Sequence, residues 1–236
     1  MAEFVDLKKK VDKIFQENDL EGLPPVRVGF AIDVSGSTSG LYASGVMQET
    51  VNVIFPIAFR LDDNGEMDFA KFGSQFELLD PVIKDNHKGY LYNNQVGAEN
   101  QGTAYEPIVT GYHSHYFGVN KAKELLGKVA GFFGKKTLVS GRGLPAVVIV
   151  LTDGACTDNA ATRAALTSTY RQCSDQPIFF LWVGVGAEED FAYLKNYRKD
   201  FKHCDHVYFS DLNVSEDFLY QQLFTVKFVN WLKGFK

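Results

Sequence analysis

Residues 28–40 read VGFAIDVSGSTSG, an apolar run that ends abruptly in an acid, small hydroxyl side chains and glycines. Such a run suits a strand that is buried on both faces. A long segment with helical spacing of apolar residues follows, from Leu41 to about Arg60. The order strand, polar loop, helix places this loop at the carboxyl end of a strand, where open α/β sheets bind their ligands.

The loop carries three oxygen-bearing side chains, Asp33, Ser35 and Ser37, spaced two residues apart. Alternation along an extended backbone aims all three the same way. One carboxylate and two hydroxyls are hard ligands that suit Mg²⁺, Mn²⁺ or Ca²⁺. The alternative is a helix N-cap, in which Ser or Thr satisfies free backbone N–H groups. Taken alone, the loop favours the capping interpretation.

The composition indicates an ordinary globular protein. The 236 residues, 45% hydrophobic and 22% charged, are enough for one α/β domain with a short appendage. The net charge of -5 argues against a nucleic-acid binder, which needs a basic face. The 3 cysteines, Cys156, Cys173 and Cys204, form no CxxC pair and are typical of free thiols in a reducing compartment. With no signal-peptide pattern and no apolar run near ~18 residues, we expect a cytoplasmic protein without a membrane span.

The N-terminal residues 3–18 have apolar side chains on one helical face and lysines mostly elsewhere. Membrane or partner binding is one interpretation of this helix. A helix packed on the flank of the domain, with a solvated lysine face, is the favoured one. Glu21 to Pro25 breaks the helix, so the chain divides into an amphipathic helix and linker (1–25) and one domain (26–236).

Strands and helices alternate along that domain. Strands are expected at 27–33, 66–72, 75–79, 145–151, 177–184 and 206–209, and helices at 41–60, 108–133, 158–172, 190–197 and 218–231. A hairpin at Gly73-Ser74 makes the third strand antiparallel. The pattern predicts a doubly wound α/β fold, with a mainly parallel sheet, one antiparallel edge strand and helices on both faces.

Two further segments change the interpretation of the first loop. Thr103 opens a helix after a glycine, and Asp153 follows the buried strand 145–151. Because the carboxyl ends of parallel strands share one edge of a sheet, Asp33, Ser35, Ser37, Thr103 and Asp153 can converge there. Five coincidental caps in this order are much less probable than one site.

These five residues, in this order and in these strand contexts, resemble the metal-ion-dependent adhesion site of the von Willebrand factor type A (vWA) domain. The flanking residues 41–48, 61–65 and 177–186 are similar to the A-domain of bacterial and phage tellurium-resistance proteins. The resemblance covers roughly residues 26–232.

The resemblance implies that Ser35, Ser37 and Thr103 supply hydroxyl oxygens to Mg²⁺ (or Mn²⁺ or Ca²⁺), with Asp33 and Asp153 acting directly or through water. An Asp or Glu of a protein partner completes the coordination. The implied function is a non-enzymatic, cation-dependent binding module, with a role in tellurium or stress resistance. The partner and the oligomeric state stay open.

Three rival interpretations remain. A Mg²⁺-dependent phosphatase of the haloacid-dehalogenase type also has an Asp after its first strand, but its second acid would stand where Ser35 is. A nucleotide-binding protein would carry a GxxxxGK[ST] or GxGxxG motif, and neither is found. His203, Cys204 and His206 form a possible transition-metal cluster that lacks a clearly spaced fourth ligand.

Overall fold

The computed structural model describes residues 3–62, 64–118, 144–154, 160–187, 191 and 194–236. Its centre is a sheet with the strand order β3-β2-β1-β4-β5-β6. All neighbouring pairs are parallel except β2 and β3, which pair antiparallel at one edge. The strands are β1 (Arg27–Asp33), β2 (Asp68–Phe72), β3 (Phe76–Leu78), β4 (Ala146–Thr152), β5 (Ile178–Val185) and β6 (Cys204–Phe209). The predicted fold class is therefore confirmed.

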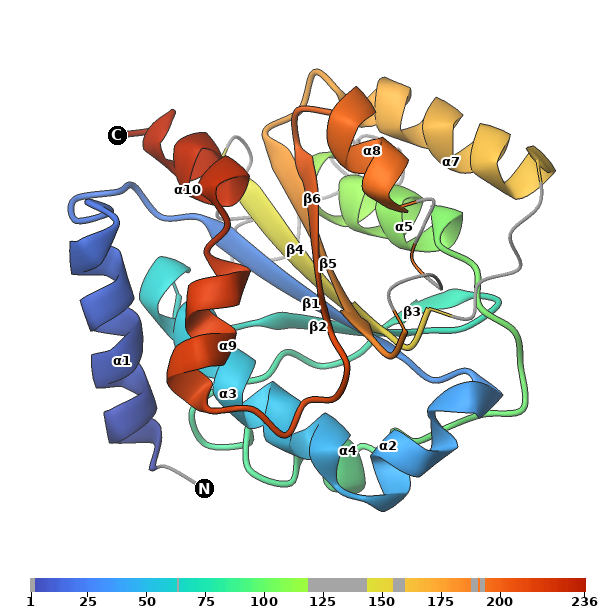
Figure 1. The fold of residues 1–236 in the computed structure, drawn as a ribbon, viewed down its shortest axis with the longest axis horizontal. Coiled ribbons are helices and arrows are strands. Elements are labelled where there is room, and N and C mark those ends of the chain that lie inside the picture. Colours follow the sequence, from blue (N-terminus) through green and yellow to red (C-terminus); the bar gives the residue numbers. More distant parts are fainter. Residues whose placement is uncertain (1–2, 63, 119–143, 155–159, 188–190, 192–193) are drawn as a thin grey trace, which may run out of the picture.

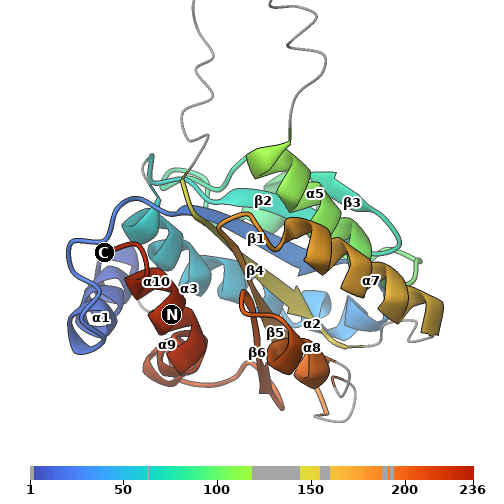
Figure 2. The ribbon, with the colours of Figure 1, turned by 90° about the horizontal axis from the view of Figure 1, so that it is seen from above.

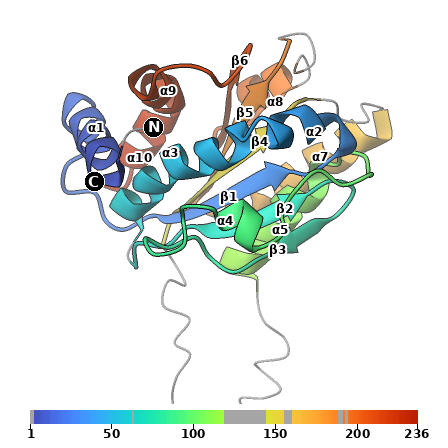
Figure 3. The ribbon, with the colours of Figure 1, turned by 90° about the horizontal axis from the view of Figure 1, so that it is seen from below.

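Helices cover both faces of the sheet (Figures 1 and 2). One layer holds α1 (Phe4–Glu17), α3 (Val46–Leu61), α9 (Glu216–Leu223) and α10 (Val226–Lys233), with the short α2 (Ser39–Ala43) and α4 (Tyr90–Asn93) near its end. The other layer holds α5 (Glu106–Phe117), α7 (Ala160–Cys173) and α8 (Leu194–Asp200). Figure 3 shows α3 along the sheet, with α1 beside it and α2 at its far end.

The central strands are buried on both sides. Every residue of β4 and β5 is buried, as is every residue of β1 after Arg27. Successive side chains of β4 alternate between two apolar clusters: Val147 and Ile149 pack toward α3, and Val148 and Val150 pack toward α5 and α7. A strand that is buried on both faces needs the unbroken apolar sequence that these segments have.

The helix expected at 41–60 is interrupted. After a 3₁₀ turn at Gly36–Thr38, the structure has α2, then Gly45 at φ +81°, then α3. A positive φ is readily adopted by glycine, so Gly45 ends one helix and allows the chain to turn into the next. The apolar spacing runs across this break, which is why the sequence suggested one helix.

The helix expected at 218–231 is likewise two helices, α9 and α10. Ser215 caps α9 as predicted, accepting a hydrogen bond from the Phe218 N–H. Thr225 caps α10, accepting from the Phe228 N–H, and its hydroxyl donates to Asp205 Oδ2 at 2.6 Å. The contact between Thr225 and Asp205 of β6 therefore stabilises the break between α9 and α10. The helical spacing of the apolar residues does not reveal this break.

The N-terminal helix α1 packs against α3 and α9. Its apolar side chains Val11, Ile14 and Phe15 belong to the same buried cluster as α3, and Lys10 forms ion pairs with Glu216 and Asp217. The boundary predicted at residue 26 separates α1 from the domain in the sequence. In the structure, α1 packs into the same apolar core as α3.

Some expectations lie outside the described residues, among them the part of the helix beyond residue 118, the loop 135–143 and Cys156. Among the described helices, none combines the length and the hydropathy needed to cross a bilayer.

Candidate functional site

The candidate site lies at the carboxyl edge of the sheet, between two neighbouring strands. Asp33 ends β1 and Thr152 ends β4, and the preceding residues Ile32 and Leu151 are paired in register. The chain leaves β1 toward α2 and α3 on one face, and α7 follows β4 on the other face. This divergence is a topological switch point, the usual location of a ligand site in an open α/β sheet.

Asp33 is held rigidly in the interior, with an exposed fraction of 0%. Its Oδ1 accepts a hydrogen bond from the Ser35 N–H at 2.8 Å, and its Oδ2 accepts one from the Thr152 hydroxyl at 2.6 Å. Burial raises the pKa of Asp33, and the hydrogen bonds from Ser35 and Thr152 oppose that rise. The carboxylate is therefore fixed in orientation and poorly solvated, so it would gain from a nearby cation.

Ser35 and Ser37 lie side by side, with their hydroxyl oxygens 3.1 Å apart. Ser35 is buried and Ser37 is exposed. Ser35 precedes the 3₁₀ turn at Gly36–Thr38, but its side chain makes no capping hydrogen bond. The capping alternative is therefore not observed for Ser35, and the exposed Ser37 gives this pair of hydroxyls an opening to solvent.

Thr103 comes from a third segment that is tied to the first loop. The Glu99 N–H donates to the Val34 carbonyl at 2.5 Å, and the Gly36 N–H donates to the Gln101 carbonyl at 3.3 Å. Thr103 is 4% exposed, and within the described part of the chain its hydroxyl has no hydrogen-bond partner. The N-cap position of α5 is occupied by Tyr105, so Thr103 does not cap this helix either.

Asp153 directly follows Thr152 and lies close enough to Asp33 for its charge to contribute to the raised Asp33 pKa. Its Oδ1 is buried and, like the Thr103 hydroxyl, has no hydrogen-bond partner among the residues that the structure describes. Burying an unpaired polar oxygen costs roughly 1–3 kcal/mol, so native structures rarely tolerate it without a ligand or water. Two such oxygens, on segments that both contact the Asp33 region, fit a bound cation.

Sequence reasoning missed two supporting residues, Thr152 and Tyr105. The Thr152 hydroxyl lies 3.1 Å from the Tyr105 hydroxyl, donates to Asp33 Oδ2 and accepts from the Gly154 N–H at 3.2 Å. Because Tyr105 is two residues from Thr103, this hydroxyl pair connects all three segments of the site. Thr152 could have been found because it is a polar residue at the end of an apolar strand. No feature of the sequence marks Tyr105 as part of the site.

A hollow of about 630 Å³ adjoins the first loop. It is lined by Val34, Phe72 and Phe76 and by the charged side chains Lys71 and Glu99. Lys71 forms ion pairs with Glu99 at 2.8 Å and with Glu77 at 3.2 Å. The surface beside the site is therefore concave and polar, with acidic side chains around one lysine.

The site contains oxygen donors only, which suits Mg²⁺, Mn²⁺ or Ca²⁺ and not a soft metal. Among the described residues, no group of three or more His, Cys, Asp or Glu side chains is arranged to hold a metal. The structure therefore does not support the cluster proposed at His203, Cys204 and His206. Cys204 is 1% exposed, and burial raises its pKa to about 12, as is usual for a thiol in an apolar core.

A family model described as "vWA-TerF-like: vWA found in TerF C terminus" matches residues 25–236. The chain belongs to this family. The predicted vWA resemblance is thereby confirmed, and the match begins one residue before the predicted domain boundary.

Two individual proteins also match this chain. An uncharacterized protein of Bacillus subtilis (strain 168), YcbR, is 27% identical over 241 residues, which cover 98% of this chain and 88% of YcbR. Proximal thread matrix protein 1 of the mussel byssus matches 84% of this chain with 13% identity and a TM-score of 0.44. The chain spans about half, 47%, of that mussel protein.

Proposed function

We propose that this vWA domain is a cation-dependent protein-binding module without enzymatic activity. Ser35, Ser37 and Thr103 would hold a divalent cation through their hydroxyls, and Asp33 and Asp153 would act directly or through water. The observation that carries this proposal is a pair of buried oxygens, Thr103 Oγ1 and Asp153 Oδ1, for which the described residues offer no hydrogen-bond partner.

The donor set explains why a partner would be needed. Three neutral hydroxyls and two carboxylates leave room in the six-oxygen shell that Mg²⁺ prefers. When bound, the cation supplies a positive centre that attracts an acidic group. Ser37 is the exposed member of the set, so a partner's Asp or Glu would approach from its side. The adjoining hollow around Lys71 would receive neighbouring partner side chains.

The rival enzymatic function has weaker support. A phosphatase of the haloacid-dehalogenase type needs an acid at position 35, two residues after Asp33, and the residue there is a serine. The Asp33 carboxylate also has both oxygens engaged by hydrogen-bond donors. A nucleophile needs a free oxygen aimed at the substrate, so this arrangement favours binding over phosphoryl transfer.

Calorimetric titration with Mg²⁺, Mn²⁺ and Ca²⁺ tests the cation site. Asp33→Ala and Thr103→Val should each weaken cation binding at least about tenfold, the loss typical of disturbed metal-site residues. Ser39→Ala removes an exposed hydroxyl of α2 that is not in the proposed set, and should leave binding unchanged. Asp33→Ala protein that binds the cation as the wild type does would refute the assignment.

Partner binding is tested separately, by pull-down with and without a chelator. A partner that is retained with Mg²⁺, lost with chelator and lost from Asp33→Ala protein supports the adhesion mechanism. We further propose a role in tellurium or stress resistance, on the basis of the match to the TerF-like family, and tellurite sensitivity of cells that lack the protein tests it. We also place the module in the cytoplasm, which cell fractionation tests.

A further inference from the structure

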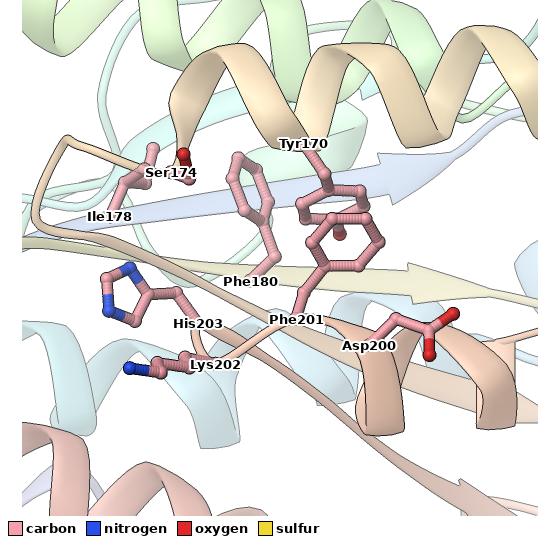
Figure 4. Close-up of a pocket in the computed structure, with 8 residues that line it drawn as sticks. All are labelled: Tyr170, Ser174, Ile178, Phe180, Asp200, Phe201, Lys202 and His203. Atoms are coloured by element: carbon pink, nitrogen blue, oxygen red, sulfur yellow. The ribbon is translucent and has the colours of Figure 1, made fainter.

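A second candidate site lies at the opposite edge of the sheet. A pocket of about 370 Å³ opens between the end of α7, the end of α8 and the first residues of β5 and β6 (Figure 4). The candidate cation site is at the carboxyl ends of the strands, so this pocket is separate from it. Pockets of this size commonly take small molecules when apolar walls are combined with a few polar groups.

Aromatic rings form the pocket walls. Tyr170 of α7 stacks on Phe201 with 4.9 Å between ring centroids, and meets Phe180 of β5 edge-on at 5.6 Å. Tyr170 and Phe180 are almost fully buried, and the Tyr170 hydroxyl accepts a hydrogen bond from Trp182 Nε1 at 2.8 Å. The rings are therefore fixed before any ligand arrives, which lowers the entropic cost of binding one.

The mouth of the pocket is polar and asymmetric. Figure 4 shows the Lys202 ammonium on the same side of the rings as His203, with the Asp200 carboxylate pointing away on the other side. Lys202 is exposed and His203 is partly buried. Burial lowers the pKa of His203, which favours its neutral imidazole, a group that can both donate and accept hydrogen bonds. One side of the mouth thus presents a cation and an imidazole beside an aromatic wall.

We propose that this pocket binds a small planar aromatic molecule that carries one carboxylate. The ring would lie against Phe201, the partly exposed ring that Tyr170 supports from behind, since offset or edge-on ring contacts are favourable beyond their buried area. The carboxylate would lie at Lys202 and His203. This inference is independent of the cation site and needs neither metal nor protein partner.

Ligand-observed ¹⁹F NMR with 4-fluorobenzoate tests the proposal on the whole chain in the presence of chelator. We expect saturable binding at millimolar or lower concentration, and weaker binding of the uncharged 4-fluorobenzamide. Cyclohexanecarboxylate, which has the charge without the aromatic ring, should compete poorly. No saturable binding of 4-fluorobenzoate, or equal binding of the amide, overturns the proposal.

Variants locate the binding. Lys202→Ala should weaken 4-fluorobenzoate about two- to fivefold, the effect of one exposed charge pair. Lys199→Ala, which removes another exposed lysine nearby on α8, should not change it. Ser174→Trp places a large ring at an exposed position of the rim and should abolish binding. Unchanged binding to Ser174→Trp protein with a native circular-dichroism spectrum places the ligand elsewhere and refutes the site.

Discussion

Replacing Thr152 by Val tests the architecture of the candidate site most directly. Valine has nearly the same shape as threonine, so the substitution removes one buried hydroxyl and leaves the packing of β4 intact. That hydroxyl donates to Asp33 at 2.6 Å, lies 3.1 Å from the Tyr105 hydroxyl and accepts from the Gly154 N–H at 3.2 Å. One atom therefore accounts for three hydrogen bonds.

The magnitude follows from these contacts. A hydrogen bond to a charged group contributes about 1.5–3 kcal/mol, and a neutral one about 0.5–1.5 kcal/mol. Asp33 can limit its share of the loss by taking up a proton, since burial already raises its pKa. We therefore expect Thr152→Val to lower the free energy of unfolding by about 3 kcal/mol.

Urea unfolding at neutral pH with chelator measures this loss, and Thr152→Ser is the matched control. Serine keeps the hydroxyl and loses one buried methyl group, which costs about 1 kcal/mol. Calorimetry should also show Mg²⁺ binding about tenfold weaker in the Val variant than in the Ser variant, because Asp33 loses its orienting donor. A Val variant as stable as the Ser variant would refute the claim that this hydroxyl supports Asp33.

Three other predictions concern charge, packing and reactivity. Burial raises the pKa of Asp33 in the folded state. The cation-free protein should therefore lose stability as the pH rises from about 3.9, the usual pKa of an unfolded aspartate, through the higher pKa of the folded state. Urea unfolding of Asp33→Asn protein should not show this decline. Phe15→Ala in α1 should lower the free energy of unfolding by about 3 kcal/mol, whereas the exposed Val5→Ala should change it by less than about 0.5 kcal/mol. With the other two cysteines replaced by serine, Cys204 should react with a thiol reagent at pH 8 only after unfolding, and prompt reaction of the native protein would contradict its burial.

Much of the fold was predictable because the central strands are buried on both faces. Segments such as 145–151 are apolar without interruption, a pattern typical of a strand that is buried on both faces. The two missed helix breaks have different causes. Gly45 carried a local signal that the surrounding apolar spacing masked, whereas Thr225 depends on Asp205, 20 residues earlier in the chain.

The candidate site divides in the same way. The alternating spacing of Asp33, Ser35 and Ser37 is a local signal, but taken alone it favoured helix capping, and only Thr103 and Asp153 turned it into a metal-site hypothesis. Thr152 supports that loop through Asp33, which lies 119 residues away in the sequence. Tyr105 contacts Thr152 across 47 residues. No local pattern encodes such contacts, so they become visible only when the strands are placed side by side.

The hydrogen bond between Asp33 and Thr152 also bears on when the site can form during synthesis. A ribosome that has released only β1, β2 and β3 has exposed Asp33 and both serines, yet the neighbouring strand that orients the carboxylate has not been made. The nascent chain would therefore lack the complete set of proposed cation ligands until β4 and Asp153 have left the exit tunnel. Under the proposed function, a half-made chain would not capture an acidic partner, and cation binding would mark a chain in which β1 and β4 are correctly paired.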